Sequence, residues 1–145
     1  MISIKVKILF AMSLSVLFTY AGILYLNYDN IPEVIPTHIN FKGEVDGYGN
    51  KIQLWIAAGV NVLLNIVCFF LILKPKYINF PVENKHKIYY QLRIFVSILS
   101  IFLSIVFSLM IFNSMGYTKK EIFRLLFSIL ILPGLFVVVF KKRPI

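Results

Sequence analysis

Residues 31–51 read IPEVIPTHINFKGEVDGYGNK and form the one long polar stretch in a mostly apolar chain. This stretch contains two prolines, three glycines and three of the six acidic side chains of the protein. Proline favours extended backbone before it, and glycine permits tight turns. We therefore expect a structured loop, with tight turns over residues 42–50 and with Asp46-Gly47 as a turn dipeptide.

The composition around this stretch is that of a membrane protein. Hydrophobic residues make up 59% of the 145 residues and charged residues 14%, whereas soluble domains have roughly 25% charged residues. The apolar residues occur in blocks of about twenty, the length that crosses a ~30 Å hydrocarbon core. We predict an all-α integral membrane protein with one membrane domain over residues 1–145. The bias towards Ile, Lys, Asn and Phe is typical of an AT-rich bacterial genome, which places the protein in a bacterial cytoplasmic membrane.

Four apolar blocks predict a four-helix transmembrane bundle. The predicted spans are residues 8–26, 52–73, 93–112 and 122–140, with an outer loop at 27–51 and a cytoplasmic loop at 74–91. The first block is longer than the apolar region of a signal peptide and has no convincing cleavage motif. We expect it to be a retained membrane anchor.

The basic residues predict the orientation of the spans. With the N-terminus inside, ten of the fifteen basic residues are cytoplasmic, as the positive-inside rule requires: Lys5, Lys7, Lys74, Lys76, Lys85, Lys87, Arg93, Lys141, Lys142 and Arg143. Both termini are then cytoplasmic and the loop 27–51 is outside. Because the basic residues lie at the ends of apolar blocks, the net charge of +9 does not indicate nucleic-acid binding.

Polar side chains recur on one face of two predicted spans. They are Asn61 and Asn65 in the second span and Ser97, Ser100, Ser104 and Ser108 in the third, at spacings of three or four residues. Polar groups in lipid usually bond to a neighbouring helix, so these faces predict packing of the second span against the third. The alternative is a polar path or a substrate pocket. No Asp, Glu, Lys or His lies midway along a span, which argues against proton-coupled transport.

Four side chains of the outer loop could meet at a metal ion: His38, Asn40, Glu44 and Asp46. A hydrogen-bonded structural cluster is the commoner outcome for such a group, and the segment lacks the last carboxylate of an EF-hand loop. No catalytic triad, HExxH motif or phosphate loop occurs, and a single cysteine excludes an intramolecular disulfide. We predict a non-enzymatic protein without metal or cofactor, and keep a metalloenzyme centred on His38, Glu44 and Asp46 as an alternative.

The outer loop also resembles a known family. Residues 35–40 (IPTHIN) and 43–51 (GEVDGYGNK) resemble the IPtHfn…GevDgygsK signature of a bacterial membrane family of unknown function, over roughly the first third of the chain. The same module forms the N-terminal part of SdpI-type immunity and signalling proteins, which protect a producer cell from a secreted toxin and hold a repressor at the membrane. The signature positions here are Pro36, His38, Asn40, Gly43, Asp46, Gly47 and Lys51.

The turn-rich polar stretch outside an otherwise plain helical bundle leads us to expect that the outer loop senses or binds an extracytoplasmic ligand such as a peptide or toxin, which would be similar to the role of SdpI-type proteins. The candidate site consists of the signature positions and Glu44, with the intramembrane Asn and Ser residues as a second polar region. The expected partners are the lipid bilayer, an extracytoplasmic peptide and, at the basic loop 74–91, a cytoplasmic protein. A small transporter or exporter subunit is the alternative function.

Overall fold

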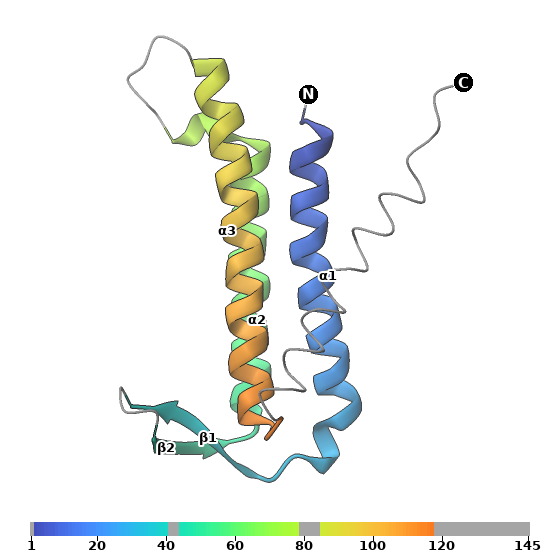
Figure 1. The fold of residues 1–145 in the computed structure, drawn as a ribbon, viewed down its shortest axis with the longest axis vertical. Coiled ribbons are helices and arrows are strands. Elements are labelled where there is room, and N and C mark those ends of the chain that lie inside the picture. The colour runs from blue at the N-terminus through green and yellow to red at the C-terminus, as the bar shows by residue number, and fades with distance from the viewer. Residues whose placement is uncertain (1, 41–43, 79–84, 118–145) are drawn as a thin grey trace, which may run out of the picture.

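The computed structural model describes residues 2–40, 44–78 and 85–117. Figure 1 shows the long helices side by side and a β-hairpin at the end of the bundle opposite the N-terminus. In chain order the elements are α1 (Ile4–Asn27), the 3-10 helix η1 (Tyr28–Asn30), β1 (Val34–Ile39), β2 (Val45–Asn50), α2 (Ile52–Leu73), the 3-10 helix η2 (Pro75–Tyr77) and α3 (Lys85–Ser114). The end of α2 and the start of α3 lie at the same end of the bundle as the N-terminus.

The three long helices are each apolar enough to cross a bilayer. The candidate spans in the described part of the chain are Ile4–Asn30, Ile52–Leu73 and His86–Ser114. They correspond to the first three predicted spans and identify a multi-pass membrane protein. The predicted fourth span, residues 122–140, lies outside the described residues.

Helix α3 is longer than the predicted third span. It begins at Lys85, so residues 85–91, which we assigned to the cytoplasmic loop, are helical. A helix satisfies its own backbone and extends at little cost once it has nucleated, so the membrane boundary does not end it. At the other end, Tyr117 N–H donates to Phe112 O at 3.1 Å. Gly116 there has a φ of 84°, a left-handed conformation that glycine adopts without steric cost.

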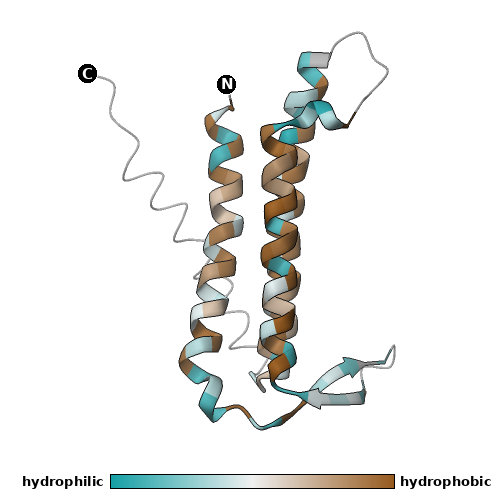
Figure 2. Cartoon of the chain, turned by 180° about the vertical axis from the view of Figure 1, so that it is seen from behind, coloured by the Kyte–Doolittle hydropathy of each residue, from teal (hydrophilic) through white to brown (hydrophobic). Residues whose placement is uncertain are grey.

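Polar side chains lie inside the bundle and large apolar side chains face outward. Ser13, Asn61 and Ser104 are fully buried, whereas Phe18 and Leu63 are 69% and 63% exposed. Lipid can solvate an apolar side chain but offers no partner to a hydroxyl or amide, so polar groups turn towards neighbouring helices. Figure 2 shows hydrophobic residues along most of each helix and isolated hydrophilic positions between them.

Two apolar clusters lie at opposite ends of the bundle. The cluster at the N-terminal end consists of Val6, Cys68, Ile72 and Val96. The cluster near the hairpin consists of Val16, Leu17, Tyr20, Leu24, Ile31, Ile35, Leu54, Ala58, Ile111 and Phe112. Because Ile31 and Ile35 belong to the second cluster, the hairpin is packed on the helix ends.

The hairpin corrects the all-α prediction. Strands β1 and β2 form an antiparallel pair. Ile35 is buried and its neighbour Val34 is exposed, because successive side chains of a strand point to opposite faces. The predicted Asp46-Gly47 turn is also wrong, because both residues lie within β2. The chain reverses earlier: Asn40 N–H donates to Glu44 O at 2.9 Å, and Glu44 N–H donates to Asn40 Oδ1 at 3.0 Å.

Candidate functional site

The predicted loop residues are distributed along the hairpin and its junction with α2. Pro36 and His38 are in β1, Asp46 and Gly47 are in β2, Asn40 and Glu44 flank the reversal, and Lys51 directly precedes α2. Gly43 lies outside the described residues. The structure therefore brings most of the signature together on one small element.

His38 and Asp46 form an exposed pair. The Nδ1 atom of His38 lies 2.5 Å from Asp46 Oδ1, and the two side chains are 70% and 43% exposed. The register shifts on both sides of His38, which pairs with Gly47. Such bulges re-aim side chains locally. The irregular register thus accompanies the contact between these two side chains.

Gly47 permits the close approach of the two strands at this point. A Cβ atom added to Gly47 would lie 2.8 Å from His38 Cβ, too close for any larger residue without movement of a strand. We expected tight turns over residues 42–50, but neither Gly47 nor Gly49 has a positive φ, and in the described part of the chain only Gly116 does. The requirement for glycine at position 47 is therefore one of space between strands.

The four candidate metal ligands separate into two pairs. Asn40 Nδ2 donates to Glu44 Oε2 at 3.2 Å, while His38 contacts Asp46. Among residues 2–40, 44–78 and 85–117, no three His, Cys, Asp or Glu side chains are grouped so that they could hold a metal ion. The four side chains therefore form two separate hydrogen-bonded pairs, each of which joins one side of the hairpin to the other.

Lys51 joins the segment before β1 to the start of α2. Its Nζ donates to Glu33 Oε1 at 2.9 Å and to Ile31 O at 3.4 Å, and it lies 4.9 Å from the centre of the Tyr28 ring. The hydrogen bond with Glu33 raises the pKa of Lys51, although burial partly opposes this. Lys51 is thus a cationic clamp at the base of the hairpin.

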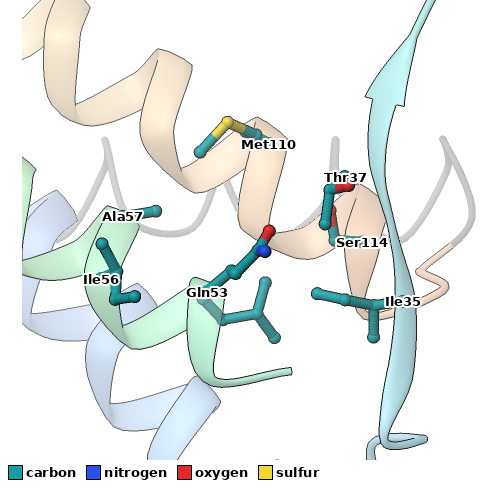
Figure 3. A pocket seen from close by; sticks show the side chains of 8 residues that line it. Ile35, Thr37, Gln53, Ile56, Ala57, Met110 and Ser114 are labelled. Atoms are coloured by element: carbon teal, nitrogen blue, oxygen red, sulfur yellow. The ribbon is translucent and has the colours of Figure 1, made fainter. Parts of the chain in front are cut away.

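A pocket of about 380 Å³ lies between β1, the start of α2 and the end of α3. Figure 3 shows it, with the Gln53 amide pointing from α2 towards the last turns of α3. Neither His38 nor Asp46 lines it. The lining is mainly apolar with three polar side chains: Ile35, Thr37, Gln53, Leu54, Ile56, Ala57, Met110 and Ser114. We refer to it as the hairpin pocket.

The sequence analysis did not predict the hairpin pocket. Its walls come from three elements that are distant in sequence, and residues such as Ala57 and Met110 carry no chemical signal by themselves. Only Ile35 and Thr37 lie within the segment that resembles the known signature. No local pattern could have identified the α2 and α3 walls.

The second polar region is a network inside the membrane-spanning part of the bundle. Asn65 is at its centre. Asn65 Oδ1 accepts from Ser13 Oγ at 2.7 Å and from Ser100 Oγ at 2.8 Å. Asn65 Nδ2 donates to Asn61 Oδ1 at 2.8 Å and to Ser104 Oγ at 3.2 Å. One amide therefore links all three helices.

The network includes two residues of α1 that the sequence analysis missed. Ser13 bonds to Asn65, and Tyr20 OH accepts from Asn61 Nδ2 at 2.8 Å. Ser13 and Tyr20 are seven residues apart and so share one helical face. This spacing of seven residues was the feature of the sequence that could have identified Ser13 and Tyr20. The predicted faces of α2 and α3 thus meet α1 as well as each other.

Two of the serines do not take part in the network. Ser97 Oγ donates to Arg93 O and Ser108 Oγ donates to Ile105 O, both at 2.8 Å and both within α3. In the described part of the chain, every buried side-chain nitrogen and oxygen has a hydrogen-bond partner. The network is therefore closed and fully satisfied.

The comparisons with known proteins concern the first part of this architecture. A search among curated proteins and a search among solved structures each found no match. One protein family, described as a domain of unknown function (DUF1648), matches residues 15–62, from the middle of α1 through the hairpin to Val62 in α2. The chain is thus a multi-pass membrane protein that is similar to DUF1648 over residues 15–62, which are the hairpin and the adjoining parts of α1 and α2.

Proposed function

We propose that this is a non-enzymatic membrane protein whose hairpin end binds an extracytoplasmic peptide, in the manner of SdpI-type immunity and sensing proteins. The hairpin pocket carries the proposal: it is a concave site formed where the polar hairpin covers the helix ends. The excess of basic residues at the opposite end supports an outward-facing hairpin in a bacterial cytoplasmic membrane, with both termini cytoplasmic.

The chemistry of the pocket suits a peptide side chain. Ligand sites are typically apolar with a few polar groups, and about 380 Å³ is near the lower end of their usual size range. Ile35, Ala57 and Met110 would contact an apolar side chain, while Thr37, Gln53 and Ser114 supply hydroxyl and amide groups that can bond to peptide backbone.

The strands offer a second mode of contact. The described sheet has two strands, so each strand has an edge that the other does not cover. Val34 and Tyr48 on these strands are 64% and 68% exposed and are accessible to a bound peptide. An extended peptide could pair with the free edge of β1 and place alternate side chains towards the pocket.

Transport through the membrane is the alternative, and it would use the intramembrane network. The network disfavours this function because its amides and hydroxyls are bonded to one another. One of its residues, Tyr20, also belongs to the apolar cluster near the hairpin. A polar substrate would have to displace several of these hydrogen bonds.

The test is a sensitivity assay in cells that lack the gene. Deletion should sensitise cells to a secreted antimicrobial peptide from a panel, and the wild-type gene should restore growth. Ala57→Leu, which adds a larger side chain to the pocket wall, should fail to restore it. The control Ala11→Leu, at an exposed position of α1, should restore it fully.

Two results would count against peptide binding. One is unchanged sensitivity to every peptide of the panel after deletion. The other is full protection by Ala57→Leu when the variant protein is present in the membrane at the wild-type level.

A further inference from the structure

A second pocket lies at the opposite end of the bundle, and the proposed function does not use it. It has a volume of about 470 Å³ and is formed by the end of α2, by η2 and by the first turns of α3. Its polar lining consists of Lys74, Lys76, His86, Tyr89, Tyr90 and Arg93. We refer to it as the basic pocket.

We propose that the basic pocket binds the headgroup of an anionic phospholipid, with the phosphate held by Lys74, Lys76 and Arg93. The pocket contains three cations and no carboxylate. The ion pairs His38–Asp46 and Lys51–Glu33 are in the hairpin and at its base, so neither involves a cation of the basic pocket. Among the described residues, Lys74, Lys76 and Arg93 therefore have no carboxylate ion-pair partner.

Two of the three cations are positioned by contacts that leave their charge available. Arg93 Nε donates to Ile72 O at 2.9 Å, a carbonyl in the last turn of α2, where the helix dipole favours a cation. Lys74 Nζ lies 5.6 Å from the centre of the Phe70 ring and 5.8 Å from that of Tyr77. A carbonyl and two aromatic rings orient these groups without neutralising them, so an anion can still bind.

The location of the pocket favours a lipid over a free anion. The predicted spans 52–73 and 93–112 end and begin at this pocket, which would place it at the level of the headgroups. Basic pockets between transmembrane helices on the cytoplasmic side are a known form of lipid headgroup site. Phe70 and Leu73 next to it are 48% and 43% exposed and can contact acyl chains below the headgroup.

The test measures lipid binding by the full-length protein in a neutral detergent, where no membrane surface potential contributes. Native mass spectrometry would compare phosphatidylglycerol, phosphatidylcholine and inorganic phosphate at equal concentrations. We expect phosphatidylglycerol to bind at least tenfold more tightly than phosphatidylcholine, because only the former has a net negative charge. Inorganic phosphate should compete weakly, because it lacks the acyl chains.

The variant Lys74→Gln, Lys76→Gln removes two cations and keeps the bond between Arg93 and Ile72. Each lysine near an anionic group raises the affinity about fivefold. The loss of both lysines should therefore weaken phosphatidylglycerol binding on the order of 25-fold. The matched control is Lys5→Gln, Lys7→Gln, which removes two exposed charges from α1 at the same end of the bundle. It should change binding by less than about twofold.

Three results would overturn the proposal. Equal binding of both phospholipids would show that net charge is not recognised. Equal losses in the two double variants would show a general charge effect. Tight binding of inorganic phosphate alone would assign the pocket to a soluble anion. The melting temperature of each variant is also measured. An unchanged melting temperature shows that a loss of lipid binding does not come from misfolding.

Discussion

The intramembrane network and the hairpin contain similar side chains in opposite surroundings. In the network, Asn61 and Ser104 are completely buried and are bonded to other side chains of the bundle. In the hairpin, His38 and Asp46 are paired but remain 70% and 43% exposed. The polar groups of the network are bonded to one another, whereas those of the hairpin pair are exposed.

The difference shows how the solvent decides the role of a polar group. In lipid an amide without a partner costs several kcal/mol, so the network strongly specifies which helix faces meet. At the exposed end, water competes for each hydrogen bond, and an exposed pair contributes about 0–1 kcal/mol. We therefore expect substitutions in the network to change stability and substitutions at the hairpin to change local structure and binding.

The largest expected effect is that of Asn65→Leu. This substitution removes the amide that bonds to Ser13, Ser100, Asn61 and Ser104. The buried groups left behind should lower the free energy of unfolding by about 2–4 kcal/mol, measured by denaturant titration in detergent. Asn113→Leu, at an exposed position of α3, is the control and should change it by less than about 0.5 kcal/mol. A stable Asn65→Leu protein that has lost solute flux in liposomes would instead support transport.

Gly47→Ala should have the next largest effect, and it should be confined to the hairpin. The added methyl group would lie 2.8 Å from His38 Cβ, whereas at Gly49 it would meet only the end of the flexible Gln53 side chain. Gly47→Ala should destabilise the hairpin by about 1–2 kcal/mol, seen as faster amide hydrogen exchange in β1 and β2. Gly49→Ala is the matched control. Equal exchange in both variants would show that the strands have room at position 47.

Tyr20→Phe should remove a single bond from the network. The hydroxyl accepts from Asn61 Nδ2 at 2.8 Å, and such a bond within a membrane is worth about 0.6–2 kcal/mol. A double-mutant cycle with Asn61→Ala measures the coupling free energy directly. Tyr25→Phe, on an exposed face of the same helix, should be neutral. A coupling energy of zero would mean that these residues only pack against each other.

The smallest expected effect is the loss of the Lys51 contacts at alkaline pH. Because Glu33 raises the pKa of Lys51, the clamp is complete below the usual pKa of lysine and is lost as the pH rises through the raised value. Trp55, the single tryptophan, lies 6.0 Å from the Tyr28 ring and should report this release by its fluorescence. Lys51→Gln should abolish the transition and Lys5→Gln should not. A transition that survives Lys51→Gln would belong to another group.

Hydrophobic blocks were sufficient to identify the helices. The predicted spans 8–26 and 52–73 fall within α1 and α2, because a bilayer requires about twenty apolar residues in sequence and this requirement is local. The polar faces of α2 and α3 were readable for the same reason, since helical periodicity is a property of neighbouring residues. Residues 45–50 were predicted to form tight turns, but they form strand β2.

Tertiary structure decided which of these groups meet. The pairing of β1 with β2 depends on contacts between separate segments, so the sequence pattern alone did not show that Asp46 and Gly47 lie within a strand. Likewise, Ser13 of α1 and Asn65 of α2 meet only because three helices pack around one amide. The hairpin pocket and the basic pocket each combine segments that are far apart in the chain. Local composition determines what can enter a membrane, whereas long-range packing determines which side chains form a site.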